Sequence, residues 1–196
     1  MIRLELVEYH MQKLQVKRII EKHHSYVPSN RSVGRRIDWL IYHSEHTNAF
    51  GIEEPVGMVG LGSSVYPPPK DILRYVGMTK SEYKDNFNSF GNNWRYCMTE
   101  SVPNAGSQIL KLLRHHAPIE WKKKYKNFLT HLITFVGGGN NGAVYRADNW
   151  DMVGYTAGLP EHDMVSMKWN DKEELKTKFV KPTGENKKLI FVTSVK

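Results

Sequence analysis

The middle third of the chain alternates between strand-like and helix-like segments, and this order constrains the fold more than any other feature. An apolar stretch over 94–99 leads through a short connection of small residues into a helical pattern over 108–116. A second apolar stretch, 128–136, precedes a glycine-rich break, a short helix over 143–149 and a strand over 152–156. Because such alternation requires crossover connections, it predicts a mixed α/β sheet with helices on its faces.

The flanking segments add elements of the same two kinds. Residues 70–93 form a polar stretch with one short helix expected from Thr79, and the helix over 108–116 is expected to end at Pro118 because proline cannot continue its hydrogen bonding. No linker separates two apolar cores, so we expect one α/β (α+β) domain over residues 1–196, with helices flanking a central mixed sheet. The remaining predicted elements are strands over 1–10, 36–42, 55–66 and 188–195 and an amphipathic helix over 11–23.

Charge and cysteine content indicate which partners and which cellular compartment suit the chain. Lys and Arg number 28 against 20 Asp and Glu, a net charge of +8 that favours polyanionic partners, although solubility alone accounts for the same balance. Cys97 is the single cysteine and cannot form an internal disulfide. No run reaches the roughly 18 apolar residues of a membrane helix, and no apolar leader opens the chain. We therefore expect a cytoplasmic protein without a membrane partner.

The connection Val102–Ser107 is the first candidate site. A strand that passes through small residues into a helix leaves the first backbone N–H groups of that helix unpaired, and phosphate is their usual ligand. Gly106 permits close approach of a ligand and Ser107 adds a hydroxyl. A helix capped by Asn or Ser without any ligand is the alternative. The loop has neither a Walker A pattern nor Gly-x-Gly-x-x-Gly.

The second candidate site is the short helix around Tyr145. A tyrosine hydroxyl at this position, beside the ends of the neighbouring strands, can protonate a leaving group. Packing is the alternative for Tyr145, and it is the preferred interpretation for Trp150.

Histidines and arginines provide further candidates. The pairs His23–His24 and His115–His116 are adjacent and face apart, and the pair His43 and His46 lacks a third ligand, so any metal stays unknown. The loop before residue 37 combines cations with aromatic rings, which suits a phosphate backbone and a base stacked on a ring. The run Lys122–Lys124 repeats this pattern, although a solvated helix face explains the lysines equally well.

The residues around the two candidate sites resemble a known family. The strand, the Asn-Ala-Gly-Ser loop and the helix are similar to the donor-binding segment of the GNAT N-acetyltransferase fold, and residues 24–160 resemble the Mom-like group of DNA-modification proteins. The donor loop departs from the usual Arg/Gln-x-x-Gly-x-Gly/Ala form of acetyltransferases. The resemblance is carried by Arg95, Val102-Pro103-Asn104, Ser107, Thr134-Phe135-Val136, Gly142, Tyr145-Arg146-Ala147, Asn149-Trp150, Gly154, Thr156 and Gly158.

This resemblance implies a transferase that converts adenine in phage DNA to N6-carbamoylmethyladenine and so protects the genome from host restriction enzymes. Simple acyl transfer would give the isomeric N6-glycyladenine, so a rearrangement or another activation, with bound iron as one route, would be required. The donor stays open between an acyl-CoA and a glycyl-type donor, the latter carried as a thioester or on tRNA. Double-stranded DNA is the implied partner, and the oligomeric state is unknown.

The candidate residues are assigned as follows. The catalytic set is Tyr145 as acid or oxyanion donor, Asp148 or His24 as base, and Arg95 from the resembling motif. The donor-binding set is Asn104, Ala105, Gly106, Ser107 and Gln108. Stacking is assigned to Tyr26, Trp39 and Tyr66, and phosphate contacts to Arg31, Arg35 and Arg36. The alternatives are a conventional GNAT acyltransferase acting on a protein or small amine, and a noncatalytic DNA-binding module.

Overall fold

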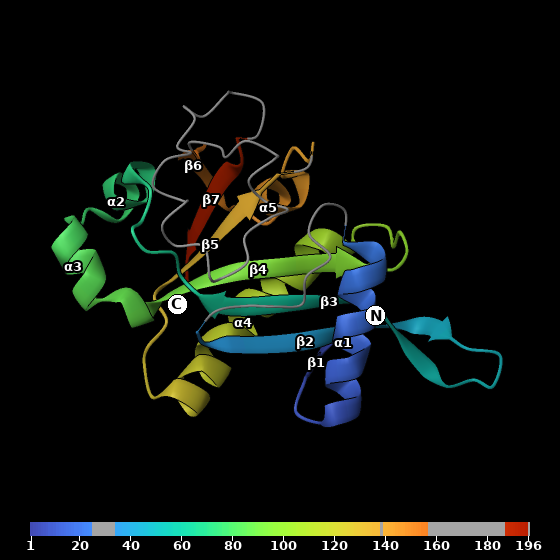
Figure 1. Ribbon diagram of the computed structural model, residues 1–196. Helices are drawn as coiled ribbons and strands as arrows, with labels where there is room; N and C mark the ends of the chain where they lie inside the picture. Colours follow the sequence, from blue (N-terminus) through green and yellow to red (C-terminus); the bar gives the residue numbers. More distant parts are fainter. Residues whose placement is uncertain (25–33, 138, 157–186, 196) are drawn as a thin grey trace, which may run out of the picture.

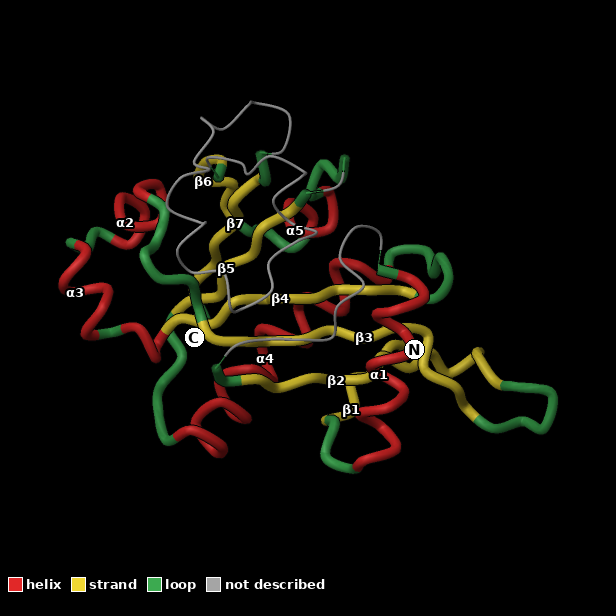
Figure 2. Tube along the Cα trace, in the orientation of Figure 1, coloured by secondary structure: helices red, strands yellow, loops and turns green. Residues whose placement is uncertain are grey.

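Seven strands form one twisted sheet with helices on both faces, as the computed structural model shows for residues 1–24, 34–137, 139–156 and 187–195 (Figures 1 and 2). The predicted mixed sheet flanked by helices is therefore confirmed. The strands are β1 (Ile2–Leu6), β2 (Arg36–Thr47), β3 (Glu53–Ser63), β4 (Phe90–Met98), β5 (His131–Val136), β6 (Asp151–Tyr155) and β7 (Leu189–Ser194). The α-helices are α1 (His10–His23), α2 (Lys70–Val76), α3 (Lys80–Asp85), α4 (Ala105–Tyr125) and α5 (Ala143–Ala147).

The strand order is β1-β2-β3-β4-β5-β7-β6, and β4 and β5 are its parallel pair. All other neighbouring strands run antiparallel. The parallel pairing is short, because it joins only Phe90–Asn92 with His131–Ile133. The later residues of both strands border a cleft instead. The sheet is therefore open at its centre, between the ends of β4 and β5.

Two layers of helices cover the sheet. Helix α4 lies behind β2–β4 in Figure 1 and contributes Leu113 and Trp121 to the largest apolar cluster, which also includes Trp39 from β2. On the opposite face, α1 packs its Ile20 against Leu40 of β2 in a second cluster. Helices α2 and α3 cover the other half of that face in a third cluster. Helix α4 thus covers one face of the sheet, and α1, α2 and α3 cover the other.

Helix α4 corrects the expected end at Pro118. The helix continues through this residue to Tyr125, so the lysine run occupies its last turn. Proline removes one backbone hydrogen bond, but Ala117 and Trp121 on either side of it are completely buried, and this packing holds the helix together. A local breaker is thus overridden by tertiary contacts.

The polar stretch 70–93 contains more regular structure than its composition suggests. Thr79 caps α3 as predicted, because its hydroxyl accepts a hydrogen bond from Glu82 N and Glu82 reaches back to the Thr79 N–H. Helix α2 was not predicted, and β4 begins at Phe90 rather than at Trp94. Among the described residues, no helix is long and apolar enough to cross a membrane.

Candidate active site

A cleft of about 370 Å³ opens where β4 and β5 separate. Its walls come from Asn93–Met98 of β4, Thr134–Gly137 around the end of β5, and Asn140–Tyr145 before and within α5. His23 and His24, at the end of α1, close it on the opposite face of the sheet. Side chains from both helix layers therefore line the cleft, and they meet at the opening between β4 and β5.

A buried polar centre lies at the base of this opening. Tyr145 is 6% exposed, and its hydroxyl donates a hydrogen bond of 2.7 Å to Asn93 Oδ1. The Asn93 amide in turn donates to Gly60 O and Arg95 O, both at 2.9 Å. The Thr134 hydroxyl donates to Asn93 O at 3.1 Å. These bonds fix the Asn93 carboxamide, so the direction of the Tyr145 O–H group is set by its neighbours.

A β-bulge at Trp94 explains why Asn93 can do this. Gly60 of β3 pairs with Arg95 while Leu61 pairs with Asn93, which leaves Trp94 as the extra residue. Asn93 then faces the α4 layer, where it meets Tyr145, whereas Trp94 packs with the α1 layer. The bulge thus places Asn93 on the α4 side of the cleft and the next two residues, Trp94 and Arg95, on the α1 side.

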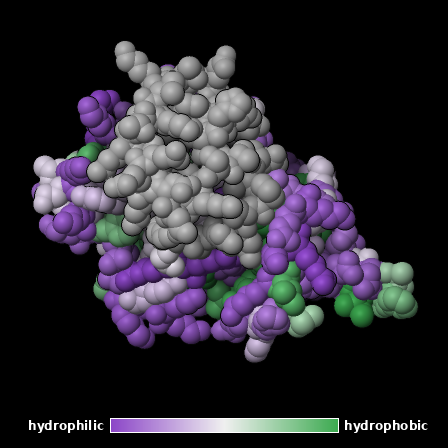
Figure 3. Space-filling view, in the orientation of Figure 1, coloured by the Kyte–Doolittle hydropathy of each residue, from purple (hydrophilic) through white to green (hydrophobic). Residues whose placement is uncertain are grey.

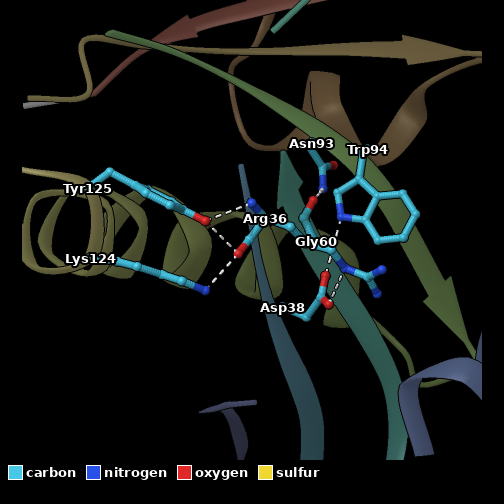
Figure 4. A network of polar contacts seen from close by, with 7 residues as sticks. All are labelled: Arg36, Asp38, Gly60, Asn93, Trp94, Lys124 and Tyr125. Carbon is cyan, nitrogen blue, oxygen red and sulfur yellow. Dashed lines mark hydrogen bonds and ion pairs between the residues drawn. The ribbon is translucent and has the colours of Figure 1, made fainter. Parts of the chain in front are cut away.

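The bulged tryptophan belongs to a polar network on the α1 side of β2 (Figure 4). Its Nε1–H donates to Asp38 Oδ1 at 3.2 Å, and the Arg36 guanidinium binds the same carboxylate and lies 4.3 Å from the Trp94 ring centroid. Burial raises the pKa of Asp38, and the charge of Arg36 opposes this rise. The Arg36 carbonyl accepts hydrogen bonds from Lys124 and Tyr125 of α4. The network ties the end of α4 to the bulge.

The predicted donor loop becomes the N-terminus of α4 next to the cleft. Asn104 is the N-cap residue with φ of 55°, and no side chain caps the helix. A Cβ at Gly106 would lie 2.5 Å from Val144 Cγ1, so only glycine permits this contact between α4 and α5. Val144, which lines the cleft beside Tyr145, thus connects the loop to the cleft, while residues 104–108 are not among those that line it. Ser107 follows in the first turn and is partly exposed.

The α1 side of the cleft is lined by His24 and Arg95. Burial, followed by the charges of Arg95 and Lys188, lowers the pKa of His24 to about 4. The imidazole is therefore neutral at physiological pH. Cys97 is buried beside them, and burial raises the pKa of its thiol to about 11, so it stays protonated.

Asp148 lies apart from the residues that line the cleft. Its two carboxylate oxygens accept hydrogen bonds of 2.8 Å from Arg114 Nε and Nη2, and Oδ2 also accepts one of 3.0 Å from Trp150 Nε1. The side chain is only 5% exposed. This geometry joins α4 to the end of α5 and leaves the carboxylate committed to structural contacts. The preference for packing at Trp150 agrees with its burial.

Of the residues predicted to contact DNA, Trp39 is buried, and Arg35 and Arg36 make contacts within the protein. Trp39 is 2% exposed inside the core between the sheet and α4, so the prediction that it stacks on a base is wrong: it is buried by the sheet's own packing. Arg35 lies 4.8 Å from the Tyr125 ring centroid, and Arg36 serves the network described above. Tyr66 is 49% exposed, and it follows Ser63, whose hydroxyl accepts a hydrogen bond of 2.9 Å from Arg35 N. Tyr26 and Arg31 fall outside the described residues.

The described histidines do not gather into a metal site. His46 Nδ1 pairs with Glu100 Oε1 at 2.8 Å. Within the described part of the chain, no group of three His, Cys, Asp or Glu side chains could hold a metal ion. The iron considered from the resemblance thus has no ligand set there.

Two residues of the site were missed in the sequence. Asn93 lies at the end of the Asn-rich stretch 70–93, which its composition marked as a surface excursion. Lys188 opens the strand predicted over 188–195 and was given no role in a site. An asparagine directly before an apolar strand was the available signal for the first. No local signal marks the second, because the contacts of Lys188 depend on the pairing of β7 with β5 and β6.

Comparisons with solved structures agree on the architecture. Arabidopsis thaliana NAA60 in complex with acetyl-CoA is similar over 100% of this chain and 99% of its own, with a TM-score of 0.59 and 12% identity. A protein from Desulfovibrio desulfuricans assigned to the GNAT family of acetyltransferases matches over 100% of both chains, with a TM-score of 0.54 and 8% identity. The aminoglycoside acetyltransferase AAC(6')-Ib in complex with coenzyme A gives a TM-score of 0.53 at 9% identity over 99% and 95% of the chains.

These likenesses show that the chain has the GNAT fold. The chain expresses this fold in its strand order, in the short parallel pairing of β4 with β5, and in the helix that follows each of these two strands. No protein-family model matches the sequence, and a search of curated protein sequences gave no match.

Proposed function

We propose that this protein is an acyltransferase that binds a coenzyme A thioester in the cleft between β4 and β5. The observation that carries the proposal is the opening beyond the three paired residues of each strand, with a tyrosine hydroxyl at its base. Structures of the same fold in complex with acetyl-CoA or coenzyme A support this class of donor. One domain spanning residues 1–196 is part of the same proposal.

The N-terminus of α4 fits the anionic part of such a donor. Its first-turn N–H groups lack a side-chain cap, and they carry the positive end of a helix of 21 residues. Gly106 keeps this turn close to α5, while the adjacent Ser107 adds a hydroxyl. We assign Asn104–Gln108 to donor binding. When bound, an acyl-CoA supplies an acyl carbon activated as a thioester, with a thiolate as leaving group.

Tyr145 is the proposed acid. Its hydroxyl lies at the cleft and is oriented by Asn93, which accepts its proton in a hydrogen bond. A proton held at this oxygen is available to a leaving group that enters from the α4 side. Asn93 is then a positioning residue, because it sets the direction of the O–H bond.

The proposed base is His24 rather than Asp148. His24 lines the cleft, and with a pKa of about 4 its ring is unprotonated and can accept a proton from an acceptor amine. Asp148 is committed to Arg114 and Trp150 through both oxygens. We therefore assign Asp148 to holding α4 and α5 together.

The finer proposal keeps N6 of adenine in double-stranded DNA as the acceptor: acyl transfer from a glycyl thioester forms an amide bond to N6 and releases the thiolate, and a later rearrangement of the N6-glycyl group gives its carbamoylmethyl isomer. It is supported by the net charge of +8 and by the basic side chains at the α1 side of the cleft. The base would have to leave the stack to reach the opening between β4 and β5. A glycyl-type donor carried on tRNA is an alternative outcome of the test. Iron is not part of the proposal.

Two measurements test these levels separately. For the coarser one, acetyl-CoA at about 100 times its dissociation constant should stabilise the protein by about 2.7 kcal/mol. Absence of any stabilisation would remove the coenzyme A donor. The aminoglycoside and small-amine acceptors that other enzymes use can then be screened by release of free thiol.

For the finer level, the protein is coexpressed with a plasmid whose DNA is digested to nucleosides for mass spectrometry. We expect a modified deoxyadenosine, lost in Tyr145→Phe and retained in the exposed-site control Tyr155→Phe. Hydrolysis separates the isomers, because a glycyl group is released from adenine whereas a carbamoylmethyl group becomes carboxymethyl. Unmodified deoxyadenosine throughout would remove DNA adenine as the acceptor and leave the coenzyme A proposal standing.

A further inference from the structure

Three basic side chains converge on the α1 side of the cleft from three separate elements. His24 ends α1, Arg95 follows the bulge in β4, and Lys188 precedes β7. His24 and Arg95 line the cleft directly. The aliphatic stem of Lys188 covers Gly137, a lining residue, since a Cβ there would lie 3.0 Å from Lys188 Cγ. The three groups thus share one corner of the cleft.

Their charges act on one another. Burial and the charge of Arg95 lower the pKa of Lys188. The charges of Arg95 and Lys188 both contribute to the lowering of the His24 pKa. Gathering like charges in a partly buried site costs free energy, because each disfavours the charged form of the others. Perturbed groups of this kind cluster where a protein binds or transforms a charged ligand. An anion placed in this corner would attract the charged groups and so offset their mutual repulsion.

Arg95 is oriented before any ligand arrives. Its Nη1 donates to Trp94 O at 2.8 Å, and its guanidinium lies 4.8 Å from the Trp94 ring centroid. The Trp94 ring is itself held by Asp38 and Arg36. A guanidinium fixed in this way loses less conformational entropy when it binds an anion, and its planar fork matches the oxygens of a phosphate.

The corner lies on the opposite side of the sheet from the proposed donor. Tyr96 and Met98 of β4 pack with the α4 layer, whereas Trp94 and Cys97 pack with the α1 layer. A ligand held by Arg95 therefore occupies the α1 side and reaches Tyr145 only through the opening between β4 and β5. This is the side from which an acceptor would approach a donor bound at α4.

We infer that Arg95, Lys188 and His24 form a phosphate-binding subsite for the acceptor, which carries its nucleophile beside a phosphate group. This inference rests on the proposed function and specifies the acceptor class of the same site. The phosphate oxygens would accept hydrogen bonds from Arg95 and Lys188, with His24 next to the acceptor amine. The phosphate could belong to the acceptor or to the donor, and the two sources are separated by the test.

The test compares binding of 5′-dAMP and deoxyadenosine to the full chain by isothermal titration calorimetry. We expect dAMP to bind more tightly, by about tenfold to a hundredfold for one or two charge-assisted hydrogen bonds. Lys188→Met keeps the aliphatic stem over Gly137 and should reduce the affinity for dAMP about tenfold, toward that of the nucleoside, because Arg95 remains. Lys187→Met is the matched control, because the adjacent Lys187 is exposed, and it should leave dAMP binding unchanged.

Three results would overturn the subsite: equal affinity for dAMP and deoxyadenosine, no dAMP binding at millimolar concentration, or equal losses in the two lysine variants. A loss of acetyl-CoA affinity in Lys188→Met, with dAMP binding intact, would assign the phosphate to the donor and overturn it as well. The proposed function fails independently. If dAMP binds through its phosphate but no acyl transfer is observed, the subsite stands and the proposed function fails. If acyl transfer is observed and Lys188→Met changes neither transfer nor dAMP binding, the function stands and the subsite fails.

Discussion

Replacing Asp148 by asparagine separates a structural carboxylate from a catalytic one. The substitution keeps the shape of the side chain but removes the charge that binds Arg114 through two hydrogen bonds of 2.8 Å. Breaking a buried ion pair by changing one partner costs about 3–5 kcal/mol. Because the Arg114 side chain is 32% exposed and water can solvate part of it, we expect a loss of about 2–3 kcal/mol.

Urea denaturation at equilibrium measures this loss directly, and thermal unfolding should show a midpoint lower by about 4–12 °C for a chain of this size. Asp151→Asn is the control, since Asp151 is exposed and bonds only the Tyr75 hydroxyl among its described contacts. Folded Asp148→Asn, assayed well below its midpoint, should keep acyl transfer. Unchanged stability combined with lost transfer would refute the structural reasoning and return Asp148 to the catalytic set.

Four further predictions concern the cleft. Gly106→Ala places a Cβ 2.5 Å from Val144 Cγ1 and should weaken acetyl-CoA binding, with rescue in the double variant Gly106→Ala/Val144→Ala; calorimetry without rescue would contradict the contact. Lys188→Met should raise the pKa of His24 from about 4 toward 6.5, which NMR titration of the imidazole measures. Because the folded-state pKa of His24 lies below 6.5, the unfolded chain binds this proton first, and stability should fall as pH drops from 6.5 to 4. Tyr145→Phe should slow turnover about a hundredfold or more while acetyl-CoA binding persists, and an unaltered rate would exclude it as the acid.

The hairpin that joins β2 and β3 extends from the body of the molecule and carries its clearest exposed apolar surface. Phe50 is 87% and Ile52 is 63% exposed near its tip, and Figure 3 shows green hydrophobic atoms at the right edge of the molecule, where the hairpin extends. Glu45, Glu53 and Glu54 give the hairpin acidic flanks. These charges make the hairpin a poor surface for a nucleic acid.

Local patterns predicted most of the elements and part of the site. The order of strands and helices in the middle third and the cap at Thr79 follow from short-range residue patterns. Such patterns succeed because periodicity and capping are decided within a few residues. They failed at Pro118, where burial of Trp121 outweighs one lost hydrogen bond, and at Trp39, whose neighbouring arginines suggested a surface ring.

The sequence by itself determined the fold class, because the succession of apolar strands and helices leaves few ways to bury both faces of one sheet. Only the tertiary structure decided the chemistry of the cleft. The bulge at Trp94 turns Asn93 toward Tyr145 and Arg95 toward His24, and strand pairing brings Lys188 to the same corner from the end of the chain. A one-residue change in register sends a side chain to the opposite face of a sheet, and no local pattern reports on it.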